Sequence, residues 1–238
     1  MIANVALVIP VCDPDEGRFP ALVRRLRTDF AHVVVVDDGS TRGRAAFDSI
    51  KGEVDVVLVH SANCGKGAAL KTAFSWVLEK LPGAVGVVTV DGDGQHTPED
   101  VLRVAEELLN APDGGLVLGV RSFGRDVPFR SRLGNLWTRV LFRLLTGLAV
   151  SDTQTGLRGI PTHLLPSILA IPGDRYEYEI RVLANARQHH APIREIPIKT
   201  IYLDGNSASH YRPLRDTLLT QSALWGCLFS KPNQSSAK

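Results

Sequence analysis

Short runs of β-branched residues alternate along the chain with longer stretches in which apolar residues recur every three or four positions. The first pattern predicts buried strands, and the second predicts amphipathic helices. We expect strands at residues 5–9, 33–36, 54–59, 85–90 and 116–120. We expect helices at residues 19–30, 68–81, 101–109 and 180–187. The alternation predicts an α/β fold, a doubly wound, mostly parallel sheet with helices on both faces.

The regular alternation of strands and helices stops after Ser122. We find no linker, repeat or low-complexity segment before the polar end of the chain, and therefore expect one domain over residues 1–230. Its two halves are residues 1–122 and 123–230, and the tail at 231–238 is expected to be disordered. A chain of 238 residues is long enough for one α/β domain with a sizeable core.

Composition narrows the class of protein. The chain is 44% hydrophobic and 22% charged, as is usual for soluble globular proteins, and its net charge of +2 argues against a nucleic-acid partner. Cys12, Cys64 and Cys227 lack metal-binding spacing and predict a reduced, cytosolic chain. The first ten residues are expected to form a strand rather than a signal peptide. No uninterrupted apolar stretch approaches the ~20 residues that span a bilayer, so we expect any membrane contact to be peripheral.

Acidic residues follow three of the predicted strands. Asp13 and Asp15 follow the first strand, Asp37 and Asp38 the second, and Asp91 and Asp93 the fourth. Because ligands of parallel sheets bind at the carboxyl ends of the strands, these carboxylates are expected to share one edge. A single Asp-Gly pair is usually only a turn. Together, the three sets predict a site for hydroxyl groups or for Mg²⁺ or Mn²⁺, which prefer carboxylate oxygens.

A glycine-rich turn, Asn63-Cys64-Gly65-Lys66-Gly67, leads from the third strand into a helix. Backbone N–H groups at such a helix start, together with Lys66, can bind an anion, although a solvated lysine at a helix start explains the pattern equally well. The turn is not a Walker A loop, and Leu70 replaces the last glycine of the dinucleotide fingerprint. Both differences count against an ATPase and a dinucleotide-binding enzyme.

Five motifs, in order over residues 5–213, resemble those of family 2 glycosyltransferases and, within that family, of dolichyl- or polyprenyl-phosphate sugar transferases. They are Ile9-Pro10, Val36-Asp37-Asp38-Gly39-Ser40, Asn63-x-Gly65-Lys66-Gly67, Asp91-x-Asp93-x-Gln95-His96 and Ser151-Asp152-x-x-x-Gly156-x-Arg158. The resemblance implies a GT-A fold, a nucleotide-sugar donor and a divalent metal, Mg²⁺ or Mn²⁺. It also implies that residues 1–122 bind the donor and that residues 123–230 face the acceptor.

The resemblance also implies roles for residues at the donor. Asp91, Asp93 and Gln95 are expected to bind the metal. The residues expected to bind the donor are Pro10, Asp13, Asp38, Lys66, Asp91, Arg158, His210 and Arg212. For Arg158, pairing with a carboxylate is the alternative. Cys12-Asp13 stands where the family usually has Tyr-Asn, so the choice between a GDP-sugar and a UDP-sugar stays open.

On the acceptor side, Asp152 matches the family's aspartate and is expected to be the catalytic base or an orienting group, with a cap or turn as the alternative. A sugar hydroxyl needs a general base, whereas a phosphate is already anionic and needs mainly orientation. Arg121, Arg130 and Arg132 are expected to bind an acceptor phosphate, because the guanidinium fork suits phosphate geometry. Residues 176–179 (YEYE) predict a capped helix start or support for the rim of the site.

Residues 129–150 combine an apolar stripe with Trp137 and with arginines at 132, 139 and 143. This pattern is typical of a helix lying in a membrane interface and equally of a core-packed surface helix. The family resemblance favours the membrane, and a second apolar stretch, residues 217–229, is too short to span it. We therefore expect a cytoplasmic protein, peripheral at the inner face of the membrane. It would serve cell-envelope glycan synthesis, and an integral membrane partner that receives the product is left open.

Three functions are compatible with the sequence. The first is inverting, metal-dependent transfer of a sugar to a polyprenyl or dolichyl phosphate, and the second is the same donor chemistry on a saccharide or another hydroxyl. The third is a nucleotidyltransferase or a non-catalytic nucleotide-binding protein. Nucleotidyltransferases usually carry a basic, glycine-rich loop after the first strand, whereas here residues 11–15 are acidic. This difference favours the first two functions.

Overall fold

The computed structural model describes residues 1–111, 114–121, 140, 142–144, 147, 149–188 and 191–199. Its strands are β1 (Ile2–Val11), β2 (Phe30–Asp37), β3 (Val56–Val59), β4 (Gly86–Thr89), β5 (Leu116–Arg121), β6 (Arg158–Pro161) and β7 (Ile193–Ile198). Its helices are α1 (Arg18–Arg27), α2 (Arg44–Ile50), α3 (Lys66–Lys80), α4 (Pro98–Asn110), α6 (Leu165–Leu169) and α7 (Glu177–Gln188), with a 3₁₀ turn at Thr162–Leu164.

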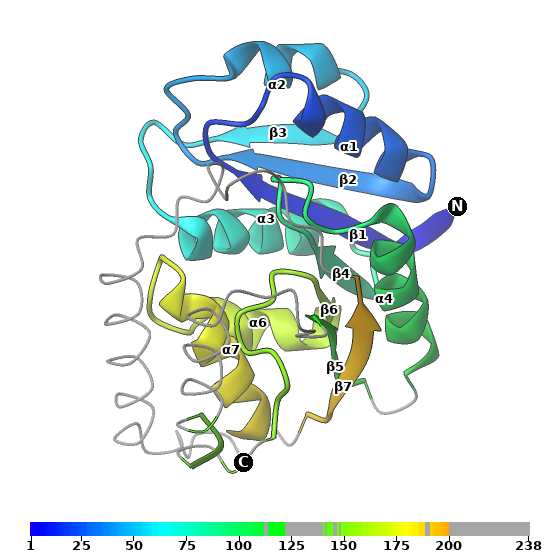
Figure 1. Cartoon of the computed structure of the whole chain (residues 1–238), viewed down its shortest axis with the longest axis vertical. Coiled ribbons are helices and arrows are strands. Elements are labelled where there is room, and N and C mark those ends of the chain that lie inside the picture. The colour runs from blue at the N-terminus through cyan, green and yellow to red at the C-terminus, as the bar shows by residue number, and fades with distance from the viewer. Residues whose placement is uncertain are drawn as a thin grey trace.

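The described strands form one seven-stranded sheet in the order β3-β2-β1-β4-β6-β5-β7 (Figure 1). β1 pairs in parallel with β2 and β4, β2 with β3, and β5 with β7, whereas β6 runs antiparallel to both of its neighbours. The prediction of a mostly parallel α/β sheet is confirmed, and all five expected strands are present. β6 and β7 add to the sheet from the second half of the chain.

The sheet packs helices against both faces because its strands alternate their side chains. Val5, Leu7 and Ile9 of β1 lie in one core cluster with residues of α1, α2 and α4. Ala6 and Val8 point the other way, into a cluster with α3, α6 and α7. The near-continuous apolar strands expected from the sequence are therefore buried on both sides, as the doubly wound arrangement requires.

α4 begins with a capped turn, three residues before the expected start at residue 101. Thr97 Oγ1 accepts a hydrogen bond from the backbone N–H of Asp100 at 3.1 Å, and Pro98 occupies the first turn. The cap satisfies one of the helix's unpaired N–H groups, and proline loses nothing at a position that has no intrahelical partner. This capped start fixes where the loop after β4 ends.

The predicted amphipathic stretch at 129–150 is described only in part. Residues 140 and 142–144 are helical. Phe142 is fully buried in a cluster with residues of β5 and α7, whereas Leu144 is 76% exposed and Val140 is also exposed. One side of this helical segment thus packs on the core while apolar side chains remain on the other. None of the helices in the described part of the chain is long and apolar enough to cross a membrane.

Candidate active site

The acidic strand ends meet at one edge of the sheet. β1 pairs in parallel with both β2 and β4, so the residues after these strands emerge side by side. The backbone N–H of Asp38 donates to the carbonyl of Val11 at 2.9 Å, which ties the end of β2 to that of β1. Asp91 follows β4 closely, and α3 begins near it with Lys66. The predicted convergence of carboxylates is therefore present.

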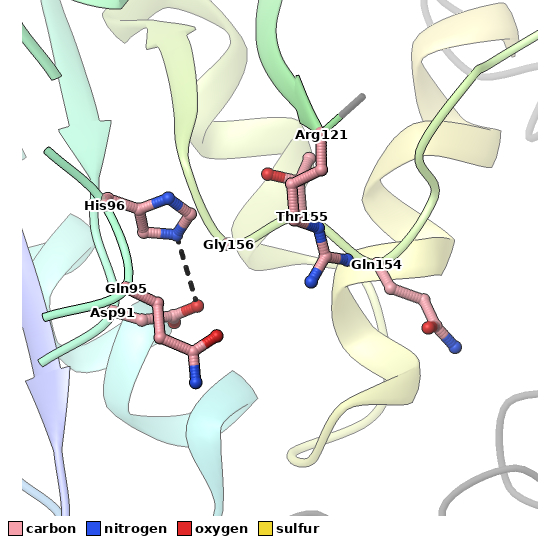
Figure 2. A pocket seen from close by; sticks show the side chains of 7 residues that line it. All are labelled: Asp91, Gln95, His96, Arg121, Gln154, Thr155 and Gly156. Carbon is pink, nitrogen blue, oxygen red and sulfur yellow. Dashed lines mark ion pairs between the residues drawn. The ribbon is translucent and has the colours of Figure 1, made fainter. Parts of the chain in front are cut away.

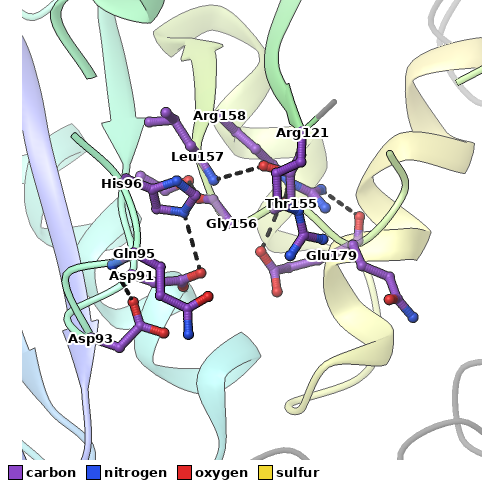
Figure 3. A network of polar contacts seen from close by, with 12 residues as sticks. Asp91, Asp93, Gln95, His96, Arg121, Thr155, Gly156, Leu157, Arg158 and Glu179 are labelled. Atoms are coloured by element: carbon purple, nitrogen blue, oxygen red, sulfur yellow. Dashed lines mark hydrogen bonds and ion pairs between the residues drawn. The ribbon is translucent and has the colours of Figure 1, made fainter. Parts of the chain in front are cut away.

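Asp91, Asp93 and Gln95 lie together on the loop after β4 (Figure 3). Gly156, on the chain that leads into β6, faces this loop, and a Cβ on it would come within 2.3 Å of Asp91 Oδ2. Only glycine leaves room for the Asp91 carboxylate in this position. The loop is held in shape by the backbone N–H of Gln95, which donates to Asp93 Oδ1 at 3.0 Å.

Lys66 and His96 lie beside the Asp91 carboxylate. Lys66 Nζ lies 2.6 Å from Asp91 Oδ1. His96 Nε2 lies 3.6 Å from Asp91 Oδ2, as Figure 2 shows. Burial works against ionisation of Asp91, but the Lys66 ammonium and His96 outweigh it and hold the pKa of Asp91 well below its usual range. Burial likewise opposes the charge of Lys66, yet Asp91 and Glu179 raise its pKa, so the ammonium is retained.

The pKa of Asp93 is shifted in the direction opposite to that of Asp91. Burial first, and then the negative charge of Asp91, raise the pKa of Asp93 above its usual value. Two carboxylates in such a position repel each other, and a divalent cation between them removes the repulsion. Oxygens from Asp91, Asp93 and Gln95 are the ligands that Mg²⁺ and Mn²⁺ prefer. The oxygen donor set therefore fits the expected metal.

Asp38 organises the turn that precedes α3. Its Oδ1 lies 2.8 Å from His60 Nδ1 and accepts from the backbone N–H of Cys64 at 2.9 Å, while Oδ2 accepts from that of Gly65 at 2.8 Å. His60 Nε2 in turn lies 3.0 Å from Thr72 Oγ1 on α3. This network sets the direction in which Lys66 leaves the turn. No motif in the sequence indicated the part played by His60.

Asp38, His60 and Cys64 also place one potential ligand atom each within 4.8 Å of one another, an arrangement able to hold a metal ion. Both Asp38 oxygens already accept hydrogen bonds from the turn, and a metal would have to compete with them. We interpret this group as a hydrogen-bonded support for the turn, separate from the Asp91–Asp93 pair.

Asp13 joins the loops after β1 and β2. Its backbone N–H donates to Ser40 Oγ at 2.8 Å, and its Oδ1 accepts from the N–H groups of Thr41 and Arg42 at 2.7 and 2.8 Å. Desolvation on its own would raise the pKa of Asp13, but the hydrogen bonds from Arg42 and Thr41 outweigh it and lower that pKa. Asp13 thus keeps its charge while it shapes the rim above β1, where Pro10 is buried.

Asp152 is fully buried and paired with Arg121. Arg121 Nε donates to Asp152 Oδ2 at 2.6 Å and Nη2 donates to Oδ1 at 3.1 Å, while the backbone N–H of Gln154 donates to Oδ1 at 3.1 Å. Both oxygens of Asp152 are therefore engaged. The pairing of these two residues, each of which the sequence assigned to the acceptor side, was not predicted.

Arg158 lies behind the site with only 2% of its surface exposed. It donates to the carbonyls of Thr155 and Glu179 at 2.8 and 2.6 Å, and its Nε lies 3.8 Å from Glu179 Oε1. Its described contacts match the alternative of a carboxylate partner, and contact with a donor stays a prediction. Glu179 also lies 2.9 Å from Lys66 Nζ, so the YEYE segment supports the site as well as starting α7.

One pocket is lined by residues from the donor side and from the acceptor side of the site. Its lining consists of Asp91, Gln95, His96, Arg121, Gln154, Thr155 and Gly156 (Figure 2). Asp91 and His96 come from the loop after β4, and Arg121 with Gln154 and Thr155 comes from the other side of Gly156. The pocket thus joins an acidic wall suited to a cation with a wall that carries a guanidinium. Arg130, Arg132, His210 and Arg212 lie outside the described residues.

The paired carboxylates and the pocket lie at the carboxyl ends of a doubly wound sheet, which is where proteins of this architecture bind their ligands. The family described as Glycosyl transferase family 2 matches residues 7–160, and the chain belongs to that family. The protein is a glycosyltransferase, as the sequence motifs implied.

Relatives with similar sequences are named for lipid phosphates. The UDP-N-acetylglucosamine–dolichyl-phosphate N-acetylglucosaminyltransferase of Methanococcus voltae is 28% identical over 86% of this chain and 88% of its own length. The undecaprenyl-phosphate mannosyltransferase of Micrococcus luteus is 30% identical over 82% of each chain. The polyprenol monophosphomannose synthase of Mycolicibacterium smegmatis is 29% identical over 81% of this chain and 75% of its own.

A solved structure with the same fold is glucosyl-3-phosphoglycerate synthase from Mycobacterium tuberculosis, in complex with Mn²⁺, UDP-glucose and phosphoglyceric acid. It superposes with a TM-score of 0.72, covering 94% of this chain and 79% of its own, at 20% sequence identity. This likeness confirms the predicted GT-A fold.

Proposed function

We propose that the protein is an inverting, metal-dependent glycosyltransferase that moves a sugar from a GDP- or UDP-sugar to a polyprenyl or dolichyl phosphate. The observation that carries the proposal is the pocket lined by both Asp91 and Arg121, in which the half-buried Arg121 is held by the buried carboxylate of Asp152. A diphosphate donor and a phosphate acceptor are both anionic, so each needs its own positive charge. The relatives named for lipid phosphates support this acceptor class.

On the donor side, Asp91, Asp93 and Gln95 would hold Mg²⁺ or Mn²⁺, which supplies positive charge for the departing nucleoside diphosphate when it is bound. Lys66 adds a second cation beside Asp91. Pro10, Asp13 and Asp38 form the rim that receives the nucleoside.

Two arginines and a histidine complete the proposed donor site. Arg158 supports the site from the interior, because it donates hydrogen bonds to the carbonyls of Thr155 and Glu179. His210 and Arg212 are proposed to reach the diphosphate from the loop that contains them.

On the acceptor side, Arg121 is proposed to bind and orient the acceptor phosphate, with Arg130 and Arg132 beside it. Asp152 holds Arg121 through two charge-assisted hydrogen bonds, which fix the plane of the guanidinium. A phosphate oxygen is already anionic, so it can attack the anomeric carbon in line and invert it without a general base. Asp152, whose oxygens are both engaged, is therefore an orienting group in this proposal.

The membrane surface is the proposed location of the acceptor. Leu144 and Val140 expose apolar side chains next to exposed Arg143, while Phe142 anchors the same segment in the core. An apolar surface beside basic residues is suited to a membrane interface. We propose peripheral binding at the cytoplasmic face, with the product passed to an integral membrane partner in cell-envelope glycan synthesis.

The test is a donor screen by thermal shift and by transfer to a polyprenyl phosphate in detergent. GDP- and UDP-sugars are compared with Mn²⁺, with Mg²⁺ and with chelator. We expect one donor to raise the melting temperature only with metal, and the same donor to yield a glycolipid. Equal stabilisation with chelator, or pyrophosphate release in place of sugar transfer, would reject the proposal.

A further inference from the structure

Lys66 sits between two carboxylates from separate elements. Its Nζ lies 2.6 Å from Asp91 Oδ1, on the loop after β4, and 2.9 Å from Glu179 Oε2, on α7 (the two carboxylates appear in Figure 3). Only 15% of the Lys66 side chain is exposed. The ammonium therefore lies in the interior of the site, against a carboxylate that the proposed metal would also require.

The position of Lys66 is fixed by its surroundings. A Cβ on Gly67 would lie 2.6 Å from Tyr178 Cβ, so the start of α3 is pressed against the start of α7. The backbone N–H of Ala68 donates to the carbonyl of Asp174 at 2.9 Å and holds the two together. The lysine can change partner by rotating its side chain, but its backbone is constrained.

Glu179 has capacity for a further hydrogen bond. Its Oε1 is buried and, among the described residues, accepts none, although Arg158 Nε lies 3.8 Å away. An ammonium group has three donors, so Lys66 can exchange its bond to Asp91 for a second bond to Glu179. The site thus offers the lysine an alternative anion within reach.

We propose that Lys66 is an exchangeable cation of the donor site, and that Glu179 is the positioning residue that keeps it when Asp91 binds the metal. The inference rests on the proposed function and deepens it. The Lys66 ammonium and a divalent ion compete for the Asp91 carboxylate and repel each other. A bound diphosphate removes that conflict, because Lys66 can then bond to it while remaining on Glu179. Metal alone should therefore bind weakly, and metal and nucleoside diphosphate should strengthen each other.

The experiment is a titration with Mn²⁺ alone, followed by electron paramagnetic resonance and calorimetry, and then with GDP and UDP in saturating Mn²⁺. We expect Lys66→Gln to bind Mn²⁺ several-fold more tightly than the wild type and to bind the nucleoside diphosphate more weakly. Lys66→Arg keeps the charge and should leave Mn²⁺ affinity near that of the wild type. Lys80→Gln is the matched control, because Lys80 lies at the other end of the same helix and pairs with Glu79 at the surface.

Glu179→Gln distinguishes a transfer of Lys66 from Asp91 to Glu179 from simple repulsion between Lys66 and the metal. In the wild-type background it should weaken Mn²⁺ binding, because Lys66 is then held by Asp91 alone. In the Lys66→Gln background most of this effect should vanish, since the two residues act together. An equal effect of Glu179→Gln in both backgrounds, or weaker Mn²⁺ binding by Lys66→Gln, overturns the inference. Should the wild type bind no Mn²⁺ with or without nucleotide, the proposed metal site itself fails, and this inference fails with it.

Discussion

The contact between Arg121 and Asp152 changes the role that we assign to Asp152. A carboxylate in a motif on the acceptor side suggests a base, but here both oxygens of Asp152 accept hydrogen bonds, two of them from the guanidinium of Arg121. A group so engaged can orient a guanidinium with high accuracy, and it is poorly placed to take a proton. The sequence placed both residues on the acceptor side, and only the fold could show that they form a pair 31 residues apart.

We predict that Asp152→Asn lowers turnover by about 10- to 100-fold, the cost of one or two charge-assisted hydrogen bonds. Donor affinity should stay within about twofold of the wild type, because the pair lies on the acceptor side. Steady-state kinetics and donor calorimetry provide the two measurements, and the pH profile should keep its shape because no base is lost. A collapse of donor affinity with unchanged turnover would place Asp152 in the donor site instead.

Gly156 is the residue whose lack of a side chain the site depends on. We predict that Gly156→Ala displaces the Asp91 carboxylate, since the added Cβ would meet Asp91 Oδ2 at 2.3 Å. Metal-dependent donor binding should fall at least tenfold, the effect of losing about 1.4 kcal/mol. Gly83→Ala is the control, because a Cβ there meets nothing within 4 Å. Unchanged calorimetric affinity in Gly156→Ala would contradict the described position of Asp91.

We predict that Asp93→Ala abolishes metal-assisted binding of the nucleoside diphosphate and leaves the fold intact. Removing Asp93 takes away one proposed ligand, whereas its only described hydrogen bond is to the local backbone N–H of Gln95. Chelator should have the same effect on the wild type. Calorimetry with and without metal measures both, and affinity that is indifferent to chelator would show that the carboxylates serve another purpose.

At the scale of elements, the strands that the sequence revealed are those with continuous β-branched character. β6 (RGIP) and β7 (IREIPI) were missed because they carry glycine, proline and charged residues, and α2 was missed because seven residues hold too little periodicity. Their places are decided by tertiary pairing: β6 fits between β4 and β5 in an antiparallel register. That insertion is what brings Gly156 against Asp91.

The helical segment around residues 140–144 is the element that we expect to meet the membrane. Arg143 is exposed beside exposed Leu144, and Arg139 belongs to the same predicted stripe. Each basic residue near an anionic surface contributes about 1 kcal/mol, so Arg139→Glu with Arg143→Glu should weaken flotation with anionic liposomes by at least tenfold. High salt should weaken the wild type in the same direction.

The double change should leave the melting temperature nearly unaltered, because the described Arg143 is a surface residue. Arg24→Glu with Arg25→Glu on α1 is a matched control, since both arginines are exposed on another helix. Flotation that is equally weakened by the control would point to overall charge rather than to this segment.

At the scale of the whole molecule, the two halves of the chain were predictable to different degrees. The donor side is built from local motifs at the ends of parallel strands, and the sequence identified Asp38, Lys66, Asp91 and Asp93 from their spacing and resemblance. The links between the halves depend on side chains far apart in sequence: Glu179 reaches Lys66, and Arg121 reaches Asp152. Periodicity and motif spacing carry no information about such contacts, so only the fold shows that Glu179 pairs with Lys66 and that His60 supports Asp38.

The identity of the acceptor distinguishes the proposed transfer to a lipid phosphate from transfer to a saccharide or another hydroxyl. The most direct test supplies the purified protein with its donor, Mn²⁺ and one of three acceptors: a polyprenyl phosphate, the same polyprenol without phosphate, or a soluble saccharide. Transferred sugar is then measured in the lipid and aqueous phases. We predict rapid transfer to the polyprenyl phosphate, none to the polyprenol, and a strong loss with Arg121→Ala. Transfer to the saccharide or the polyprenol at the same or a higher rate would contradict the account.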